Sequence, residues 1–264
     1  MKRRGFLALI GLAITSLLLR IGLPFLVPST VVAQSNTTLL VSAAASLKEV
    51  LEESKTVYQQ RQPGVNINFN FGASGALLQQ IQQGAPADIF ISAANRQVDT
   101  LQQSGQLVTS TRSILAKNRL VLVVPRRANG ITSFFSLTNP SVKRIAIGEP
   151  RSVPAGQYAE QVLQKLKIYD RVKSKLVFTN NVRQVLAAVE AGNADAGLVY
   201  RTDAAISNKV RTVVAADEKY HSPIVYPAAV LSRSKSTDAA RAYLQFLASD
   251  QGKAIFKKYG FVLS

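Results

Sequence analysis

The stretch IQQGAPADIFIS, residues 81–92, decides the fold because it joins the end of one element to the start of another. Its order is an apolar residue that closes a helical stripe, a glycine suited to a helix end, an aspartate and a short apolar strand. The stretch VEAGNADAGLVY, residues 189–200, repeats that order. Two such helix-to-strand units predict two lobes of similar build.

Outward from these two stretches, short apolar strands alternate with amphipathic helical stripes. This alternation is typical of open α/β sheets, and we therefore expect an α/β fold. The expected strands are residues 39–43, 65–71, 89–92, 120–124, 145–147, 176–178, 197–200 and 225–231. The expected helices lie around residues 47–58, 77–84, 159–166, 182–189, 240–247 and 255–259.

The first 33 residues have the order of a signal peptide. Basic residues 2–4 precede the apolar run 5–19, and small residues lead to an expected cleavage after Ala33, with Gln34 beginning the mature chain. A membrane anchor is the alternative, but a run of 15 residues is shorter than the roughly 20 that span a bilayer. Arg3–Leu7 also resembles a twin-arginine signal, so both the general secretory (Sec) and the twin-arginine export route stay open.

The net charge of +17 is compatible with nucleic acid, an anionic surface or an anionic ligand. The predicted signal peptide carries four basic and no acidic residues, so the remainder has a charge of +13. Its basic residues are dispersed, without a block of like charge or interleaved aromatic residues. We therefore expect no nucleic-acid partner, and a positive field that attracts anions.

The sequence contains few of the residues and motifs that enzymes use for catalysis. It contains no cysteine, which excludes disulfides and cysteine-based metal or redox sites, and its single histidine, His221, lies in a loop-like stretch. Nothing resembles a nucleophile elbow, a phosphate-binding glycine loop or a helical pair of metal-binding histidines. We expect no catalysis, no cofactor and no directly coordinated metal.

Four predicted helix starts are better marked than the rest. Ser46 has capping-box spacing to Glu49, Ser74 is flanked by glycines, Pro154 suits a first helical turn, and Asn181 suits a helix cap. Each alone is an ordinary cap. All four follow predicted strands, at the edge where open α/β sheets bind ligands. The N-terminus of a helix offers free backbone N–H groups, which can bind an anion. The constellation predicts a small oxyanion held by neutral donors between two lobes.

The sequence resembles a known family, the periplasmic molybdate-binding proteins of ABC transporters, over essentially the whole chain after residue 33. The resemblance is carried by AAASL at residues 43–47, GAPADIFISA at 84–93, VPAG at 153–156 and GLVY at 197–200, in the family order. It implies a type II periplasmic-binding-protein fold, with a hinge and a ligand cleft between the lobes.

The resemblance also implies the ligand-binding residues. Ser46 and Ser74 would bind through hydroxyl and backbone N–H groups, Ala155 and Val182 through backbone N–H groups, and Tyr200 through its phenol. The ligand would be molybdate or tungstate as a tetrahedral oxyanion, so that molybdenum has no direct protein ligand. Another oxyanion, such as sulfate or phosphate, is the alternative.

The sequence departs from the family pattern at two places. Gly72–Gly75 contains fewer serines than the usual stretch, and Arg201 follows the tyrosine where a small residue is common. We expect Arg183 and Arg201 to be solvated surface residues. Asp88 and Asp195 are expected in turn or cap roles, because a carboxylate would repel a bound dianion.

The resemblance also implies how the chain is divided into lobes and what the protein does. Lobe I would comprise residues 34–119 and 227–264, and lobe II residues 120–226. The protein would be a soluble, monomeric, periplasmic carrier that captures the oxyanion with high affinity and delivers it to the membrane permease of an ABC importer.

Overall fold

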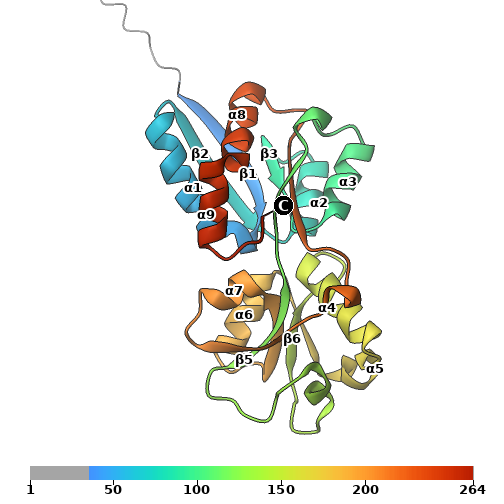
Figure 1. Ribbon diagram of the computed structural model, residues 1–264. Helices are drawn as coiled ribbons and strands as arrows, with labels where there is room; N and C mark the ends of the chain where they lie inside the picture. Colours follow the sequence, from blue (N-terminus) through green and yellow to red (C-terminus); the bar gives the residue numbers. More distant parts are fainter. Residues whose placement is uncertain (1–35, 264) are drawn as a thin grey trace, which may run out of the picture. The chain divides into compact units, whose positions relative to one another are not determined.

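The computed structural model describes residues 36–263, which belong to one compact unit. The predicted signal peptide, with its cleavage site after Ala33, lies outside the described residues. Within residues 36–263, no helix is both long and apolar enough to cross a bilayer. Two five-stranded sheets organise this part of the chain, and the predicted two-lobed α/β architecture is confirmed (Figure 1).

The first sheet, which defines lobe I, has the strand order β2-β1-β3-β10-β4. Strands β1, β2 and β3 are parallel, whereas β10 is antiparallel to both of its neighbours. The strands are β1 Thr37–Ala44, β2 Val65–Gly72, β3 Ile89–Ile91, β4 Ser113–Lys117 and β10 Val225–Val230. The helices are α1 Lys48–Arg61, α2 Ser74–Gln82, α3 Asn95–Gln103, α8 Thr237–Ala248 and α9 Asp250–Lys258.

The second sheet, which defines lobe II, has the strand order β7-β6-β8-β5-β9. Here β6 runs parallel to β7 and β8, and β5 is antiparallel to β8 and β9. The strands are β5 Leu120–Pro125, β6 Ile145–Gly148, β7 Leu176–Thr179, β8 Ala196–Tyr200 and β9 Val210–Ala215. The helices are α4 Pro154–Lys165, α5 Tyr169–Val172, α6 Val182–Glu190 and α7 Arg201–Ala205.

The central strands read as continuous apolar runs because both of their faces are covered. All three residues of β3 are fully buried between β1 and β10, and helices α1, α8 and α9 lie on the face of the sheet opposite α2 and α3 (Figure 1). Parallel strands buried on both faces are expected to lose the in-out alternation. Edge strand β2 keeps that alternation, since Ile67 is buried between exposed asparagines.

The repeated aspartates have structural roles, as predicted. Asp88 accepts the Leu40 N–H at 2.8 Å, and Asp195 accepts the N–H groups of Lys143 and Arg144 at 2.7 and 2.8 Å. Each carboxylate therefore ties the segment before one strand to a neighbouring segment of its own lobe, Asp88 to the middle of β1 and Asp195 to the residues just before β6. The two lobes use the same local device at β3 and β8.

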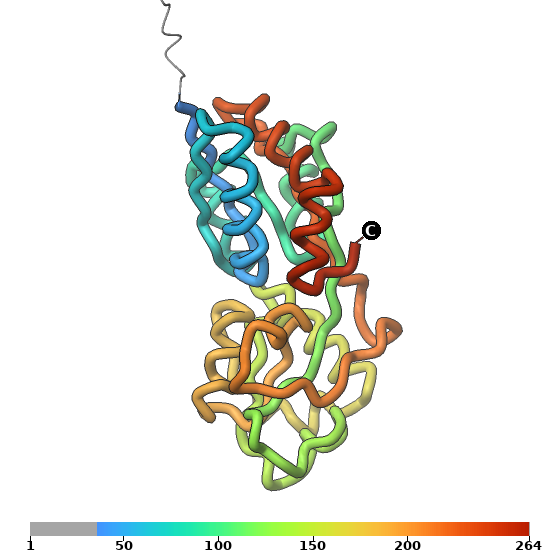
Figure 2. The backbone as a smooth tube through the Cα atoms, turned by 60° about the vertical axis from the view of Figure 1, so that its left-hand side comes forward, coloured from blue at the N-terminus to red at the C-terminus, as the bar shows by residue number. Residues whose placement is uncertain are grey.

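Segments far apart in the sequence meet in lobe I. Helix α9 packs beside α1, as the red and blue tubes of Figure 2 show. The Lys258 ammonium and the Tyr259 hydroxyl lie 2.7 and 2.8 Å from one oxygen of Glu53 on α1. The chain passes to the second sheet between Lys117 and Leu120. It returns in residues 216–224, and the exact division into residues 34–119, 120–226 and 227–264 stays a prediction.

Candidate functional site

One cavity brings together the five residues that the sequence analysis singled out. It is a small cavity of about 10 Å³ and receives residues from both lobes. Lobe I contributes Ala44, Ala45, Ser46, Gly72, Ala73, Ser74 and Ala93, and lobe II contributes Val153, Pro154, Ala155, Asn181, Val182 and Tyr200. No charged side chain lines this cavity within the described part of the chain.

The cavity lies where strands of both sheets end and helices begin. Helix α2 starts at Ser74 directly after β2, α4 starts at Pro154 after β6, and α6 starts at Val182 after β7. First-turn N–H groups have no partner inside their own helix, and the positive end of the helix dipole lies there. Ala155 and Val182 lie in these first turns and line the cavity.

The helix-start predictions have different outcomes. Asn181 caps α6, because its side chain accepts the N–H groups of Arg183 and Gln184. The predicted capping box at Ser46 is wrong. Ser46 lies in a short 3-10 helix, Ala45–Leu47, and its hydroxyl bonds to Tyr226 at 3.0 Å instead of capping a helix.

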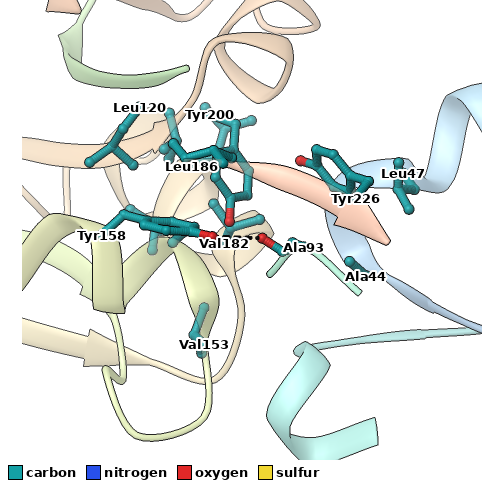
Figure 3. Packing of buried hydrophobic residues seen from close by; sticks show 14 of the residues in the cluster. Ala44, Leu47, Ala93, Leu120, Val153, Tyr158, Val182, Leu186, Tyr200 and Tyr226 are labelled. Carbon is teal, nitrogen blue, oxygen red and sulfur yellow. Dashed lines mark hydrogen bonds between the residues drawn. The ribbon is translucent and has the colours of Figure 1, made fainter. Parts of the chain in front are cut away.

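Tyr200, the last residue of β8, carries a buried hydroxyl for which the described residues provide no hydrogen-bond partner. The residue is 1% exposed and lines the cavity, and Figure 3 shows its hydroxyl on the side that faces Ala93. Burial raises the pKa of the Tyr200 phenol well above its ordinary value, so the group keeps its proton and acts as a donor. A buried donor without a partner is costly, and the Tyr200 hydroxyl is the one such phenol among the residues that line this cavity.

The Ser74 hydroxyl is oriented by the backbone. It accepts the Ala93 N–H at 3.0 Å, and both residues are buried. A serine oxygen that accepts one hydrogen still has its own hydrogen to donate. Ser74 is thereby prepared to donate into the cavity.

The two lobes touch each other around this cavity. The Gly75 N–H donates to the Ser152 carbonyl at 2.9 Å. On the neighbouring side, the Tyr158 hydroxyl donates to the Ala93 carbonyl at 3.2 Å, the dashed contact in Figure 3. These two contacts join lobe I to lobe II beside the cavity.

Arg183 is not the solvated surface residue that the sequence predicts. From α6 of lobe II, its guanidinium donates across the cleft to the Glu49 carboxylate at 3.0 Å and to the Ser46 carbonyl at 3.3 Å. Its Nε also lies 2.7 Å from Asp203 Oδ1, in an ion pair whose angle is poor for a hydrogen bond. Arg201 is exposed as expected, although it donates to the Gly260 carbonyl at 2.6 Å.

Asp203, the partner of Arg183 within lobe II, is fully buried. Burial raises the pKa of its carboxyl to about 6, against the opposing pull of the Arg183 charge and of the Tyr200 N–H bond. Because this pKa is above the ordinary 3.8, the folded protein holds a proton between about pH 4 and pH 6 that the unfolded chain has lost. The contribution of Asp203 to the free energy of unfolding therefore falls as the pH rises through this window.

Replacing Asp203 with asparagine should remove that decline. We expect the wild type to lose on the order of 2 kcal/mol more than Asp203→Asn between about pH 4 and pH 6.5. Urea unfolding across this range measures the difference in slope, which is independent of the constant cost of breaking the Arg183 ion pair. Asp170→Asn, at a carboxylate 87% exposed, is the matched control. Equal slopes in wild type and Asp203→Asn would refute this assignment.

Sequence reasoning missed three groups that support the site: Asn118, Arg183 and Tyr226. Tyr226 reads as an ordinary strand residue and Asn118 as part of a linker, yet both are buried and hydrogen-bonded to each other at 3.1 Å. Their partners lie far away in the sequence, so no local spacing signals them. Among the described residues, no group of three or more histidine, cysteine, aspartate or glutamate side chains is placed to hold a metal ion.

Comparisons with known proteins agree with this geometry. Residues 39–262 match the family model described as bacterial extracellular solute-binding protein. A Bacillus subtilis protein named as an ABC transporter substrate-binding lipoprotein is 43% identical over 230 residues, which cover 87% of this chain and 88% of that protein. The molybdate-binding protein ModA of Haemophilus influenzae is 37% identical over 84% of this chain and 88% of its own length.

Among solved structures, the periplasmic molybdate-binding protein of Azotobacter vinelandii superposes with a TM-score of 0.78. The two are 26% identical, and the match covers 86% of this chain and 99% of that one. The predicted periplasmic-binding-protein fold and the family resemblance are both confirmed. Because the family model spans residues 39–262 and a relative is 43% identical over most of its length, the chain belongs to the bacterial extracellular solute-binding proteins.

Proposed function

We propose that this chain captures molybdate or tungstate outside the cytoplasm and delivers it, chemically unchanged, to the membrane permease of an ABC importer. The observation that carries the proposal is the small cavity lined by neutral donors from both lobes, with the unpartnered Tyr200 phenol among them. Molybdate-binding relatives support the choice of anion.

The proposed ligand set is Ser46, Ser74, Ala155, Val182 and Tyr200. A hydrogen bond to a charged group contributes about 1.5–3 kcal/mol before the costs of desolvation and lobe closure. Donors from five residues can therefore reach the roughly 8 kcal/mol that micromolar affinity requires, with a margin for those costs. A tetrahedral dianion matches this set because it offers acceptors alone, and no metal–protein bond is needed.

The proposal also includes the role and the location of the protein. The cavity has no carboxylate, histidine or lysine that could act as an acid, base or nucleophile among its lining residues, which supports binding without catalysis and without a cofactor. We assign a periplasmic, monomeric carrier with lobe I at residues 34–119 and 227–264 and lobe II at 120–226, exported by its N-terminal segment. The dispersed positive charge favours an anionic ligand over nucleic acid as its partner.

Thermal unfolding tests the proposal, because a ligand that binds the native form alone raises the melting temperature. Molybdate or tungstate at about a hundredfold excess over Kd should add about 2.7 kcal/mol, which corresponds to a shift of roughly 5–11 °C for a chain of this size. Sulfate, phosphate and chloride at equal ionic strength should shift it far less. An equal response to sulfate or phosphate would replace the anion assignment, and no response to any oxyanion would refute the carrier function.

Titration calorimetry with the variant Ser74→Ala tests the position of the site. Loss of the Ser74 hydroxyl should weaken molybdate binding by about 10- to 100-fold, measured by titration calorimetry. Ser54→Ala is the matched control, since Ser54 is fully buried and bonds the Val50 carbonyl inside α1, away from the cavity. Equal affinities in the two variants would contradict the assignment of Ser74.

A further inference from the structure

Behind the Ser46 hydroxyl lies a short chain of buried hydrogen bonds to two residues, Tyr226 and Asn118, that do not line the cavity. Ser46 Oγ is 3.0 Å from the Tyr226 hydroxyl, and the Tyr226 hydroxyl is 3.1 Å from Nδ2 of Asn118. The three residues are 3%, 0% and 6% exposed. They come from the segment after β1, from β10 and from the link between β4 and β5.

Asn118 determines which group donates and which accepts in each hydrogen bond of this chain. Its Oδ1 accepts the Arg119 N–H at 2.9 Å, which fixes the amide so that the nitrogen faces the other way. Nδ2 then donates both of its hydrogens, one to Thr202 Oγ1 at 2.9 Å and one to the Tyr226 hydroxyl. A flipped amide would set its nitrogen against the Arg119 N–H, two donors face to face.

The direction continues through Tyr226. Burial raises the pKa of the Tyr226 phenol, so the group keeps its hydrogen. In the part of the chain that the structure describes, this hydroxyl has two hydrogen-bond partners, Asn118 and Ser46. Since it accepts from Asn118, its own hydrogen goes to Ser46 Oγ. Ser46 then accepts from Tyr226 and has its own hydrogen left to donate.

We propose that Asn118 and Tyr226 are positioning residues that hold Ser46 as a hydrogen-bond donor, and thereby select an unprotonated oxyanion over a protonated one of the same charge. This inference rests on the proposed function, because it assigns the basis of anion selection at the same site. The Ala93 N–H likewise donates to Ser74 Oγ and so holds Ser74 as a hydrogen-bond donor to the cavity. Both serine hydroxyls of the cavity are thus set to donate by groups behind them.

The comparison that isolates this effect is molybdate against hydrogen phosphate at mildly alkaline pH. Both anions are dianions, so a change in the charge of the site affects them alike, and their affinity ratio reports their difference in protonation and size. Hydrogen phosphate brings one hydrogen that needs an acceptor. If Ser46 accepts it, the Ser46 hydrogen no longer has that ligand oxygen as its acceptor. Its other partner, the Tyr226 hydroxyl, already donates its own hydrogen to Ser46, so one of the two hydrogens is left without an acceptor.

Asn118→Asp reverses the chain with almost no change in shape. The new carboxylate oxygen accepts the Tyr226 hydrogen, the Tyr226 oxygen accepts the Ser46 hydrogen, and Ser46 Oγ becomes free to accept from hydrogen phosphate. Tyr226→Phe removes the hydroxyl that bonds to Ser46, so that Ser46 is held neither as a donor nor as an acceptor. Tyr243→Phe is the matched control, because Tyr243 is also fully buried and its hydroxyl lacks a hydrogen-bond partner among residues 36–263.

The experiment measures Kd for molybdate and for hydrogen phosphate by calorimetry or competition in wild type, the single variants and the double variant. We expect the preference for molybdate to fall at least about tenfold in Asn118→Asp and several-fold in Tyr226→Phe. In the double variant it should equal that of Tyr226→Phe, because the effect of Asn118→Asp has to pass through the phenol. Tyr243→Phe should keep the wild-type preference.

The outcomes separate this inference from the proposed function. Wild-type protein that fails to bind molybdate refutes the proposed function itself. If wild type binds molybdate but the preference stays within about twofold in Tyr226→Phe, the inference is overturned. The same holds if Asn118→Asp lowers the preference equally with and without the Tyr226 hydroxyl. Ligand-free melting temperatures show which variants fold, and Tyr226→Phe alone decides the question if Asn118→Asp does not.

Discussion

Gly75→Ala should weaken molybdate binding on the order of a hundredfold while leaving the ligand-free protein as stable as wild type or more so. A Cβ at residue 75 would lie 2.5 Å from the Ser152 carbonyl oxygen and 2.8 Å from the Ser152 Cα, so lobe I and lobe II could not approach as they do here. The Gly75 N–H bond to Ser152 would be lost with the approach. A hundredfold loss corresponds to about 2.7 kcal/mol, within the usual cost of overpacking against rigid backbone.

The gain in ligand-free stability has a separate cause. Gly75 lies in the first turn of α2, and alanine in a helix is favoured over glycine by roughly 0.5–1 kcal/mol. Calorimetry and thermal unfolding of Gly75→Ala should therefore move in opposite directions. Gln79→Ala, at an exposed position of the same helix, is the control and should change neither affinity nor closure. Wild-type affinity in Gly75→Ala would show that the contact with Ser152 is not needed for binding.

Gly156→Ala should destabilise the protein more than the addition of a single methyl group at any other glycine of lobe II. A Cβ there would fall 1.9 Å from the Gly148 carbonyl oxygen and 2.5 Å from the carbonyl carbon, both fixed at the end of β6. Since neither backbone can yield cheaply, we expect a loss of about 3 kcal/mol or more, which lowers the melting temperature by roughly 6–12 °C. Urea unfolding and thermal unfolding measure this change.

The same substitution should also reduce binding, because α4 carries Ala155 into the cavity one residue before Gly156. Any displacement of the helix that relieves the clash moves the Ala155 N–H away from the ligand. Gln164→Ala, exposed on α4, controls for changes in helix propensity. A variant with wild-type stability would mean that α4 and β6 pack less tightly than these distances indicate.

The sequence predicted the framework of this protein because the framework depends on local patterns. Every expected strand overlaps an observed strand, and Pro154 and Asn181 begin helices as their chemistry predicts. Strands β4 (SILAK) and β9 (VRTVVA) were missed. Each carries basic or small polar residues within a short apolar run, and each is fixed mainly by pairing at a sheet edge.

The site was predictable in its outline but not in its supporting contacts. Ser46 was singled out for a capping role, yet its hydroxyl is 180 residues away in sequence from its partner, Tyr226. Arg183 was taken for a solvated residue, whereas its partner Glu49 is 134 residues away. Such contacts exist through tertiary packing alone, so neither periodicity nor spacing could have indicated them.

The position of β10 has a consequence for how the polypeptide acquires its structure during synthesis. This strand, residues 225–230, lies between β3 and β4, both of which precede it by more than a hundred residues. The sheet of lobe I is therefore incomplete while the ribosome is still making residues 120–215, whose own sheet requires nothing made later. Lobe II can therefore complete its sheet before lobe I, and the amino-terminal half has to wait for β10 with its apolar strands exposed.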